Sequence, residues 1–368
     1  MNKQISEIAL DIFPRLKSKV KTSLEKSAPE QQSDEGFNDY LPQFIDLKSE
    51  GVVFVNSRKS TDFDIFLNIK YNSIINFQRI NDIRYINKYF EKINNLLPED
   101  GAYIGTFESS KQRKKRILNK YPKIYAYPFY FGTFILKRVF PKWRFTKKIY
   151  FFLTKGKNRY LSLAEVLGRL VSCGFEIIDY AEHNVKTFFV VKKAKEPSFD
   201  PQPSYGPLFG MRRVGKDGKM IKVYKLRTMH PYAEYLQSFI HKKNSLAEGG
   251  KFRDDFRITT WGKFFRKYWL DELPMLINFI KRDLKLVGVR PLSKHYLSLY
   301  PYELQKLRSK TKPGLIPPYY ADMPKNLEEI IESEKKYLKM YFKNPIKTDI
   351  KYFSLCFKNI FLGKARSS

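Results

Sequence analysis

Residues 256–278 read FRITTWGKFFRKYWLDELPMLIN, and the last part of this stretch predicts a helix that opens on two acids. Apolar side chains recur at helical spacing here, namely Leu273, Leu276, Ile277 and Ile280. Proline is tolerated only in a first helical turn, so Pro274 places the helix start close to Leu270 or Asp271. Asp271 and Glu272 then lie at the positive helix end, where free N–H groups also attract phosphate. Neighbouring helical residues point in different directions, so one acid could attack phosphorus while the other holds a metal ion or handles a proton.

Acids in a first helical turn are ordinarily capping residues, so the pair alone is weak support for a catalytic site. The cations around the pair favour the catalytic interpretation. Three arginines flank it, and a predicted hairpin upstream adds four cations: Arg212, Arg213, Lys225 and Arg227. Arginine binds phosphate through paired hydrogen bonds, so such a set suits a diphosphate. The residues that we expect to bind substrate phosphates are Arg213, Lys225, Arg227, Arg257, Arg266 and Arg290.

The hairpin is the run RRVGKDGKMIKVYKLRTM at residues 212–229, two β-prone segments around Asp217-Gly218, a favoured two-residue turn. Beyond it, helical patterns continue to the end of the chain. Before it, residues 197–207, PSFDPQPSYGP, hold four prolines and read as a linker. We therefore predict a mainly α-helical catalytic domain with a small β-hairpin over residues 197–368.

Residues 49–196 alternate apolar strands with helical patterns, which predicts an α/β domain. Strands are expected at 51–57, 102–107, 175–179 and 187–193, and a helix at 81–97. A second helix is expected from the capping box Ser162-Leu-Ala-Glu165 to about Gly174. A cofactor-binding fold of this type needs a glycine-rich turn after its first strand, and residues 51–64, GVVFVNSRKSTDFD, lack one. We interpret the domain as degenerate Rossmann-like, with a structural or regulatory role, and residues 1–48 as a flexible segment.

The chain of 368 residues has 69 Lys and Arg against 37 Asp and Glu, a net charge of +32 that predicts an anionic partner. Residues 111–160, the basic aromatic belt, supply half of it, with sixteen Lys or Arg, fourteen aromatic residues and no Asp or Glu. Aromatic rings favour the headgroup level of a bilayer and basic side chains favour anionic lipid, so an interfacial anchor is the favoured interpretation. A solvated basic face and a nucleic-acid surface are the alternatives, and no RNP-like or helix-turn-helix motif supports nucleic acid.

Other broad classes are excluded or disfavoured by composition. Two cysteines and four scattered histidines exclude a disulfide scaffold and argue against a Cys/His zinc site. The chain opens without a charged region followed by an apolar run, so secretion is not predicted. The thirteen uncharged residues 124–136 are too short for an ordinary spanning helix. We therefore expect peripheral attachment to a membrane and release by high salt, which screens surface charge.

Residues 204 to about 362 resemble the catalytic part of the bacterial sugar transferase family, the monotopic phosphoglycosyl transferases. The similarity runs through several motifs in order: Gly206-Pro207, RVGKDGK, YKLRTM, FRITTWGKFFRKYWLDELPMLIN, DLKLVGVRPL and KPGL. The resemblance implies that a nucleotide-diphosphate sugar gives its sugar-1-phosphate to a polyprenyl phosphate, with release of nucleoside monophosphate and with Mg²⁺ assisting. It further implies that Asp271 is the nucleophile and that Glu272 lies at the metal and the phosphates. The partners implied are a nucleotide-sugar, a polyprenyl phosphate and an anionic membrane surface, on the cytoplasmic face of the inner membrane, peripheral or monotopic. No nucleic acid is expected, and the oligomeric state is open.

The chain departs from the family pattern in four places. The segment GPLFGMRRVG lacks the usual glutamine, Val289 replaces a proline, and IPPYYADMP replaces a Thr-Gly-rich stretch. The long apolar re-entrant helix is also missing, and residues 175–204 stand in its place. The basic aromatic belt is therefore a candidate substitute anchor.

A fainter resemblance, in YLSLAEVLGRLVSCGFEIID at residues 160–179, is to the later portion of class I methyltransferases. The missing glycine turn predicts that this half does not bind S-adenosylmethionine. Two alternative functions remain: a membrane-associated pseudoenzyme or assembly factor of glycan synthesis, and a methyltransferase with a basic appendix. The intact pair Asp271-Glu272 favours the transferase.

Overall fold

The structure is a computed structural model that describes residues 40–46, 51–66, 71–143, 145–199, 205–243, 246–247, 251–252 and 255–362. Two compact units make up the chain. The first comprises Met1–Pro203 and Pro231–Phe239, and the second comprises Ser204–His230 and Ile240–Ser368. Most of the predicted flexible segment 1–48, and residues 200–204 of the predicted linker, lie outside the described residues.

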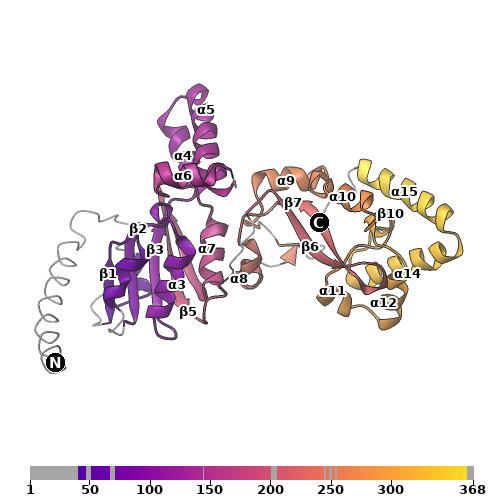
Figure 1. The fold of residues 1–368 in the computed structure, drawn as a ribbon, viewed down its shortest axis with the longest axis horizontal. Coiled ribbons are helices and arrows are strands. Elements are labelled where there is room, and N and C mark those ends of the chain that lie inside the picture. The colour runs from indigo at the N-terminus through magenta and orange to yellow at the C-terminus, as the bar shows by residue number, and fades with distance from the viewer. Residues whose placement is uncertain are drawn as a thin grey trace, which may run out of the picture. The chain divides into compact units, whose positions relative to one another are not determined.

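Five strands form the mixed sheet of the first unit: β1 (Val52–Val55), β2 (Ser73–Arg79), β3 (Ala102–Phe107), β4 (Phe175–His183) and β5 (Lys186–Lys193). Their order in the sheet is β1-β2-β3-β5-β4 (Figure 1). β1, β2 and β3 are parallel, and β5 is antiparallel to both of its neighbours. Every residue of β3 is buried, as expected for a central strand covered on both faces. Strand β2 was not predicted from the sequence, and the Rossmann-like classification stays a prediction.

Helices α3 (Ile86–Leu96) and α7 (Leu163–Ser172) pack together beside this sheet. The buried side of α3 follows helical spacing, with Ile86, Tyr89, Phe90 and Ile93. The Ser162 hydroxyl caps α7 by accepting a hydrogen bond from the Glu165 N–H at 3.2 Å. Short 3₁₀ helices complete the first unit's body: η2 (Leu41–Gln43), η3 (Ser60–Phe66), η4 (Ile80–Asp82) and η8 (Ala233–Leu236).

The segment Pro231–Phe239 packs with the first unit, which the sequence did not indicate. Its Tyr232 hydroxyl accepts a hydrogen bond from Asn87 at 2.8 Å, and the Arg169 guanidinium lies 4.5 Å from the Tyr232 ring centroid. A side chain at Gly168 would collide with the Tyr232 carbonyl at 2.3 Å. The glycine therefore permits this close approach to α7.

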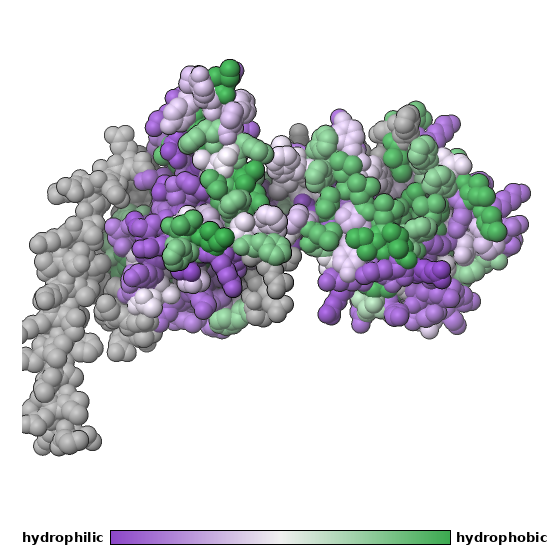
Figure 2. Space-filling view, turned by 45° about the horizontal axis from the view of Figure 1, so that its top comes forward, coloured by the Kyte–Doolittle hydropathy of each residue, from purple (hydrophilic) through white to green (hydrophobic). Residues whose placement is uncertain are grey.

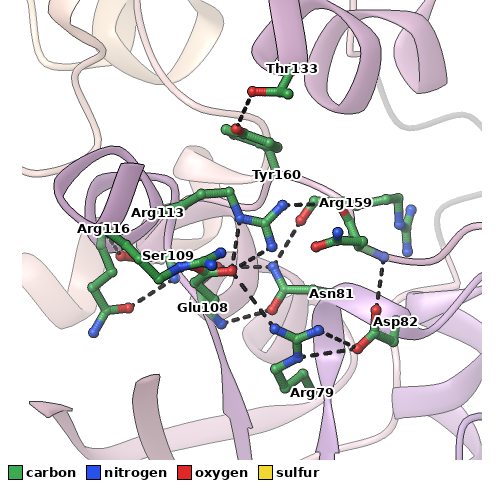
Figure 3. Close-up of polar contacts among 12 residues, drawn as sticks. Arg79, Asn81, Asp82, Glu108, Ser109, Arg113, Arg116, Thr133, Arg159 and Tyr160 are labelled. Atoms are coloured by element: carbon green, nitrogen blue, oxygen red, sulfur yellow. Dashed lines mark hydrogen bonds and ion pairs between the residues drawn. The ribbon is translucent and has the colours of Figure 1, made fainter. Parts of the chain in front are cut away.

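Charged side chains fill the region beyond the carboxyl ends of β2 and β3 (Figure 3). The Glu108 carboxylate follows β3, is 2% exposed, and accepts hydrogen bonds from Arg113 and Arg116 at 2.8 Å each. The Asn81 amide follows β2 and donates to the carbonyls of Glu108 and Arg159 at 2.9 and 2.8 Å. Ligands of open α/β sheets commonly bind beyond these strand ends. Here the protein's own groups occupy that place, and the interpretation of a degenerate domain stays a prediction.

Helix α4 (Ser110–Lys120) leads into a projection that we call the spur, residues 123–154. The spur consists of α5 (Lys123–Phe134), a π-helix η5 (Ile135–Val139), a 3₁₀ turn η6 (Phe140–Lys142) and α6 (Lys147–Thr154). In Figure 1 these helices stand beyond one end of the sheet. In the part of the chain that the structure describes, no helix is long and apolar enough to cross a membrane.

Glu165 holds the spur on the body of the first unit. Instead of closing the predicted capping box, its buried carboxylate accepts from Arg138 at 2.5 Å, Lys142 at 2.7 Å and Arg169 at 3.0 Å. Arg138 and Lys142 belong to the spur, and Arg169 belongs to α7. Burial alone would raise the pKa of Glu165, but these three cations hold it well below its ordinary value.

Glu165→Gln is expected to lower the free energy of unfolding by about 3 kcal/mol at pH 7, because it leaves one buried and two partly buried cations without their shared carboxylate. The pKa of Glu165 is lower in the folded than in the unfolded chain. Its contribution is therefore complete above the unfolded-state value of about 4.3 and is lost as the pH falls. Urea unfolding at pH 7 and pH 3 should show a gap between variant and wild type that narrows in acid. Glu182→Gln, at an exposed position, is the control, and an equally small loss for Glu165→Gln would contradict the prediction.

The second unit is mainly helical around small pairs of strands. The hairpin is β6 (Leu208–Val214) and β7 (Met220–Leu226), and its turn holds Asp217 and Gly218 at φ +54° and +73°. Both residues have positive φ, as the predicted two-residue turn requires. The remaining strands pair as β8 (Leu246–Ala247) with β9 (Lys251–Phe252), antiparallel, and β10 (Lys285–Val287) with β11 (Gly314–Ile316), parallel.

The helices of this part are α8 (Gln237–Lys243), α9 (Thr260–Lys267), α10 (Met275–Ile280), α11 (Lys294–Ser298), α12 (Tyr302–Ser309), α13 (Tyr319–Asp322), α14 (Leu327–Lys343) and α15 (Pro345–Phe361). Short 3₁₀ turns lie at η7 (Lys216–Gly218) and η9 (Leu270–Glu272). One core joins β10 and its following loop to the helices after it, through Val287, Val289, Leu292, Tyr300, Leu304, Tyr337, Leu338 and Tyr352.

Candidate active site

The start of helix α9 packs directly on Thr228, the second residue after the end of the hairpin. The Thr259 hydroxyl caps α9 by accepting from the Gly262 N–H at 2.8 Å, and the Thr259 N–H donates to the Thr228 carbonyl at 2.9 Å. A Cβ at Gly262 would lie 2.0 Å from that carbonyl, so only glycine allows this approach. Arg266, one turn along the helix, donates to the Thr228 hydroxyl at 3.1 Å. The predicted phosphate ligand Arg266 is thereby held against the end of the hairpin.

The acid pair lies in a separate 3₁₀ turn, η9, and not in the first turn of the following helix as predicted. Trp269 precedes it with φ +60°, an unfavourable conformation for a bulky residue, and breaks the chain direction after α9. Pro274 is the N-cap of α10, which begins at Met275, three residues after Glu272. Helical structure therefore starts at Leu270, as predicted, but as a 3₁₀ turn, and the α-helix itself begins only after Pro274.

The two acids interact with different groups. The Glu272 carboxylate accepts a hydrogen bond from the Lys225 ammonium at 2.7 Å, and both side chains are nearly buried. Asp271 is 4% exposed and lies close enough to Arg266 to interact with it electrostatically. Hence β7 supplies a cation to one acid and α9 supplies a cation to the other.

A second group of cations lies on the Glu272 side. Burial lowers the pKa of Arg290, but attraction by Tyr319, Tyr320 and Glu272 outweighs burial and raises it. Burial and the nearby Arg290 lower the pKa of Arg213. Two guanidinium groups this close favour an anion between or beside them. The structure thus brings Lys225 and Arg290 close to Glu272, and it brings Arg213 close to Arg290.

The Asp271 side carries its own charge pair. Asp255 and Arg257 form a buried bidentate ion pair, with the shortest contact at 2.7 Å. Burial lowers the pKa of Arg266 in spite of attraction to Asp271 and Asp255, and Arg257 adds to the lowering. Arg257 therefore lies near Arg266, as expected, but its guanidinium is engaged by Asp255.

Arg227 was also predicted to bind phosphate, but its described contacts are with Gly206 and Phe209 and not with either acid. Its Nε donates to the Gly206 carbonyl at 3.0 Å, and its guanidinium lies 5.2 Å from the Phe209 ring centroid. These contacts tie the Gly206-Pro207 segment to the end of β7.

Three aromatic residues at the site were not among the predicted site residues. Trp269 packs edge-on against Tyr320 with ring centroids 4.4 Å apart, and Tyr319 packs against Tyr320 at 4.5 Å. Tyr319 and Tyr320 belong to IPPYYADMP, one of the segments in which this chain departs from the family pattern. They connect the strained turn before the acids to the surroundings of Arg290.

Asn278 fixes α10 on the hairpin. This fully buried amide accepts from the Tyr224 N–H at 2.9 Å and donates to the Lys222 carbonyl at 2.8 Å. Both contacts are to β7, next to Lys225. Asn278 therefore helps to align η9, the turn that holds Asp271 and Glu272, with Lys225 on β7.

Gly288 and Gly314 let the backbones of β10 and β11 meet below Arg290. A Cβ added to Gly314 would lie 2.1 Å from the Gly288 nitrogen, a distance that no side chain can relieve. The Gly314 N–H also donates to the Val289 carbonyl at 2.9 Å. The motifs DLKLVGVRPL and KPGL thus meet in one tight backbone contact, to which the first contributes Gly288 and the second Gly314.

Gly314→Ala is expected to lower the free energy of unfolding by about 3 kcal/mol, because the added methyl forces two paired strands apart. Gly206→Ala is the matched control, since its Cβ would meet a single atom at 3.5 Å, an ordinary contact. Urea unfolding of both variants measures the difference. Equal stability of the two variants would show that the Gly288–Gly314 contact is not tight in solution.

The residues present fit a magnesium ion that arrives with a diphosphate. Among the described residues, no group of three or more His, Cys, Asp or Glu side chains could hold a metal ion by itself. Magnesium usually takes one or two carboxylates and completes its shell with substrate phosphates and water. Asp271 and Glu272 supply such carboxylates, and the cations around them would hold the phosphates.

Apolar side chains are exposed around the acid pair. The predicted helical stripe Leu273, Leu276, Ile277 and Ile280 faces outward, with Ile280 78% exposed, while Met275 and Asn278 are buried. Trp261, Phe264 and Tyr268 of and after α9 are exposed as well. Figure 2 shows a broad apolar area on the visible face of the second unit. The site thus combines buried charge with an apolar surround.

Comparison with known proteins shows which family the second half of the chain resembles. Residues 201–363 match the model of the bacterial sugar transferase family, which confirms the resemblance drawn from the motifs. A galactosyl transferase, CpsE, of Streptococcus agalactiae is 30% identical over 210 residues, which cover 56% of this chain and 42% of that protein. The undecaprenyl-phosphate galactose phosphotransferase of Salmonella typhimurium is 38% identical over 101 residues, 26% of this chain and 21% of that protein. The chain thus spans less than half the length of these relatives.

A third relative is the UDP-glucose:undecaprenyl-phosphate glucose-1-phosphate transferase of Klebsiella pneumoniae, 36% identical over 115 residues, which cover 30% of this chain and 23% of that protein. The family and these relatives are transferases and hence enzymes. A solved O-methyltransferase family protein from Burkholderia thailandensis covers 38% of this chain, and this chain covers 35% of it, at 10% identity and a TM-score of 0.23. A likeness this slight carries no argument.

Proposed function

We propose that this chain, whose residues 201–363 match the bacterial sugar transferase family, transfers a sugar-1-phosphate from a nucleotide-diphosphate sugar to a polyprenyl phosphate. One observation carries the proposal. Adjacent acids in one short turn interact with separate cations: Glu272 forms an ion pair with Lys225, and Asp271 interacts electrostatically with Arg266. This arrangement leaves one acid to react and the other to organise phosphate, at a site whose cations suit a diphosphate.

Asp271 is the nucleophile in this proposal. A carboxylate oxygen of Asp271 attacks the phosphorus that carries the sugar, and the bond from that phosphorus to the bridging oxygen breaks. Nucleoside monophosphate leaves with the bonding electron pair. An oxygen of the polyprenyl phosphate then attacks the same phosphorus, and the bond to Asp271 breaks, which restores the carboxylate and yields a polyprenyl diphosphate sugar.

The surrounding cations stabilise charge on the transferred phosphoryl oxygens in both steps. Arg290 lies on the Glu272 side with Arg213 near it, and Arg266 lies on the Asp271 side. Mg²⁺, held by Glu272 and the substrate phosphates, would neutralise further charge when bound. Lys225 holds the Glu272 carboxylate in place through its hydrogen bond at 2.7 Å.

The apolar surround of the site suits a lipid acceptor. Exposed side chains of α9 and α10 offer an apolar path for a polyprenyl chain next to the acids. We infer that the reaction takes place on the cytoplasmic face of the inner membrane and begins an exopolysaccharide.

The test uses the full chain with undecaprenyl phosphate in detergent, Mg²⁺ and a panel of UDP-glucose, UDP-galactose and UDP-N-acetylgalactosamine. We expect release of UMP and formation of a sugar-linked lipid with at least one donor. If no donor yields either product while the protein still binds UDP-sugar, the alternative of a pseudoenzyme or assembly factor takes the place of this proposal.

A further inference from the structure

The inner side of the spur packs against the body of the first unit through buried side chains, a hydrogen bond and ion pairs. Ala126, Pro141 and Tyr150 are buried, and the hydroxyls of Thr133 and Tyr160 lie 2.7 Å apart in a hydrogen bond (Figure 3). Together with the ion pairs of Glu165, these contacts fix the spur as a folded part of the domain. Its exposed surface is therefore presented by a defined structure.

The outer side of the spur is unusually apolar for a surface. Helix α5 exposes Ile124, Tyr125, Tyr127, Phe129 and Phe131, all at least 51% accessible. The residues that follow expose Leu136, Trp143, Phe145, Ile149, Phe152 and Leu153, with Phe152 at 82%. In α6 the exposed side chains Ile149, Phe152 and Leu153 share one helical stripe, while Tyr150 points inward.

A helix that is apolar on most sides is normally covered by protein or lipid. In α5, Ala126 is buried within the unit, whereas the apolar residues on the other sides are not. Twelve residues extend about 18 Å, too short to cross a hydrocarbon core of about 30 Å but long enough to enter one leaflet. We propose that the spur inserts its outer side into the interfacial layer of an anionic phospholipid bilayer.

Charge identifies the lipid class. Exposed lysines accompany the apolar side chains at both helices: Lys120 at the end of α4, Lys123 at the start of α5, and Lys147, Lys148 and Lys155 around α6. The spur contains no Asp or Glu. Lysines around an apolar surface fit anionic headgroups above acyl chains, and aromatic rings suit the boundary between them. Nucleic acid fits less well, because aliphatic side chains such as Ile149 and Leu153 neither stack on bases nor pair with phosphate.

This inference goes beyond the proposed function, since it concerns the first unit and does not depend on the chemistry at Asp271. It also changes one expectation from the sequence. Burial of apolar side chains is not screened by salt, so high salt should release only part of the protein from a membrane.

The test places a dye on the spur of the full chain. Native Cys173 and Cys356 are buried, so a nitrobenzoxadiazole dye reacts with an introduced thiol at Phe152→Cys or, as a control, at Val185→Cys outside the spur. Vesicles contain phosphatidylcholine alone or with about one third phosphatidylglycerol. We expect the dye at position 152, and not at 185, to shift to the blue with anionic vesicles and to be quenched by brominated lipid, in about 1 M salt as well.

A second measurement uses binding. Ile149→Ser with Phe152→Ser should lower the vesicle partition coefficient by about tenfold or more, since each exposed apolar side chain contributes more than 1 kcal/mol when buried. Ile178→Ser with Val185→Ser, at exposed apolar positions outside the spur, should leave it within about twofold. A dye at 152 that stays in water on bound protein, or that responds to RNA or to a protein and not to vesicles, would overturn the proposal. Transfer to detergent-solubilised acceptor should persist in the spur variants, so failure here and failure of the transferase proposal are distinguishable.

Discussion

Replacing Asp271 by asparagine should reduce turnover by about 10⁴-fold or more, since loss of a nucleophile removes the covalent route altogether. The amide is nearly the same size as the carboxylate but cannot attack phosphorus. Asp271 is buried in the short turn η9, where Arg266 interacts with it and the kink at Trp269 fixes its direction. Substrate binding should change little, because the cations on the Glu272 side remain. UMP release from the best UDP-sugar measures the effect.

The wild-type protein provides a direct check of the same step. Without polyprenyl phosphate, incubation with donor should yield a protein heavier by one sugar phosphate, and peptide mapping should place the adduct on Asp271. Asp217→Asn is the matched control, because its exposed hairpin turn has positive φ, which asparagine tolerates. Near-normal turnover of Asp271→Asn, or an adduct on another residue, would show that the nucleophile has been assigned wrongly.

The sequence predicted the contents of the site better than its geometry. Lys225 of the hairpin is adjacent to Glu272, as the phosphate-binding hypothesis required, whereas Arg227 of the same hairpin contacts Gly206 and Phe209. Helical spacing, however, suggested one continuous helix from the acids onward. It could not show that Trp269 adopts a left-handed conformation, because that kink is stabilised by packing on Tyr320, 51 positions later in the chain.

The contacts that the sequence missed are all of this long-range kind. Asn278 is one polar residue in an apolar run. Its side-chain amide forms two hydrogen bonds with the backbone of β7, and these depend on where β7 lies in the fold. The basic aromatic belt likewise gave the composition of the spur but not its two sides. Its cations divide between buried partners such as Arg138 and exposed ones such as Lys148, and no local spacing separates the two sets.

Glu272→Gln is the second large effect that we expect, a loss of about 10²- to 10³-fold in kcat/KM, because two functions disappear together. The amide no longer neutralises Lys225, and it is a poor ligand for Mg²⁺. The Mg²⁺ concentration that gives half-maximal activity should therefore be higher for Glu272→Gln than for the wild type. Glu272→Asp keeps the charge and should recover part of the activity, and a shift in the Mg²⁺ requirement separates a role at the metal from a role in folding.

A double-mutant cycle with Lys225→Met decides whether the pair or the acid itself matters. If Glu272 acted only by holding Lys225, its replacement would cost nothing further once the lysine is gone. If Glu272 also organises the substrate phosphates through magnesium, Glu272→Gln should still lose about tenfold or more in the Lys225→Met background. The carboxylate is 2.7 Å from that ammonium but also interacts with Arg290, which the lysine substitution leaves in place. We therefore expect the second result, and full masking of the Glu272 effect by Lys225→Met would reduce Glu272 to a structural partner of the hairpin.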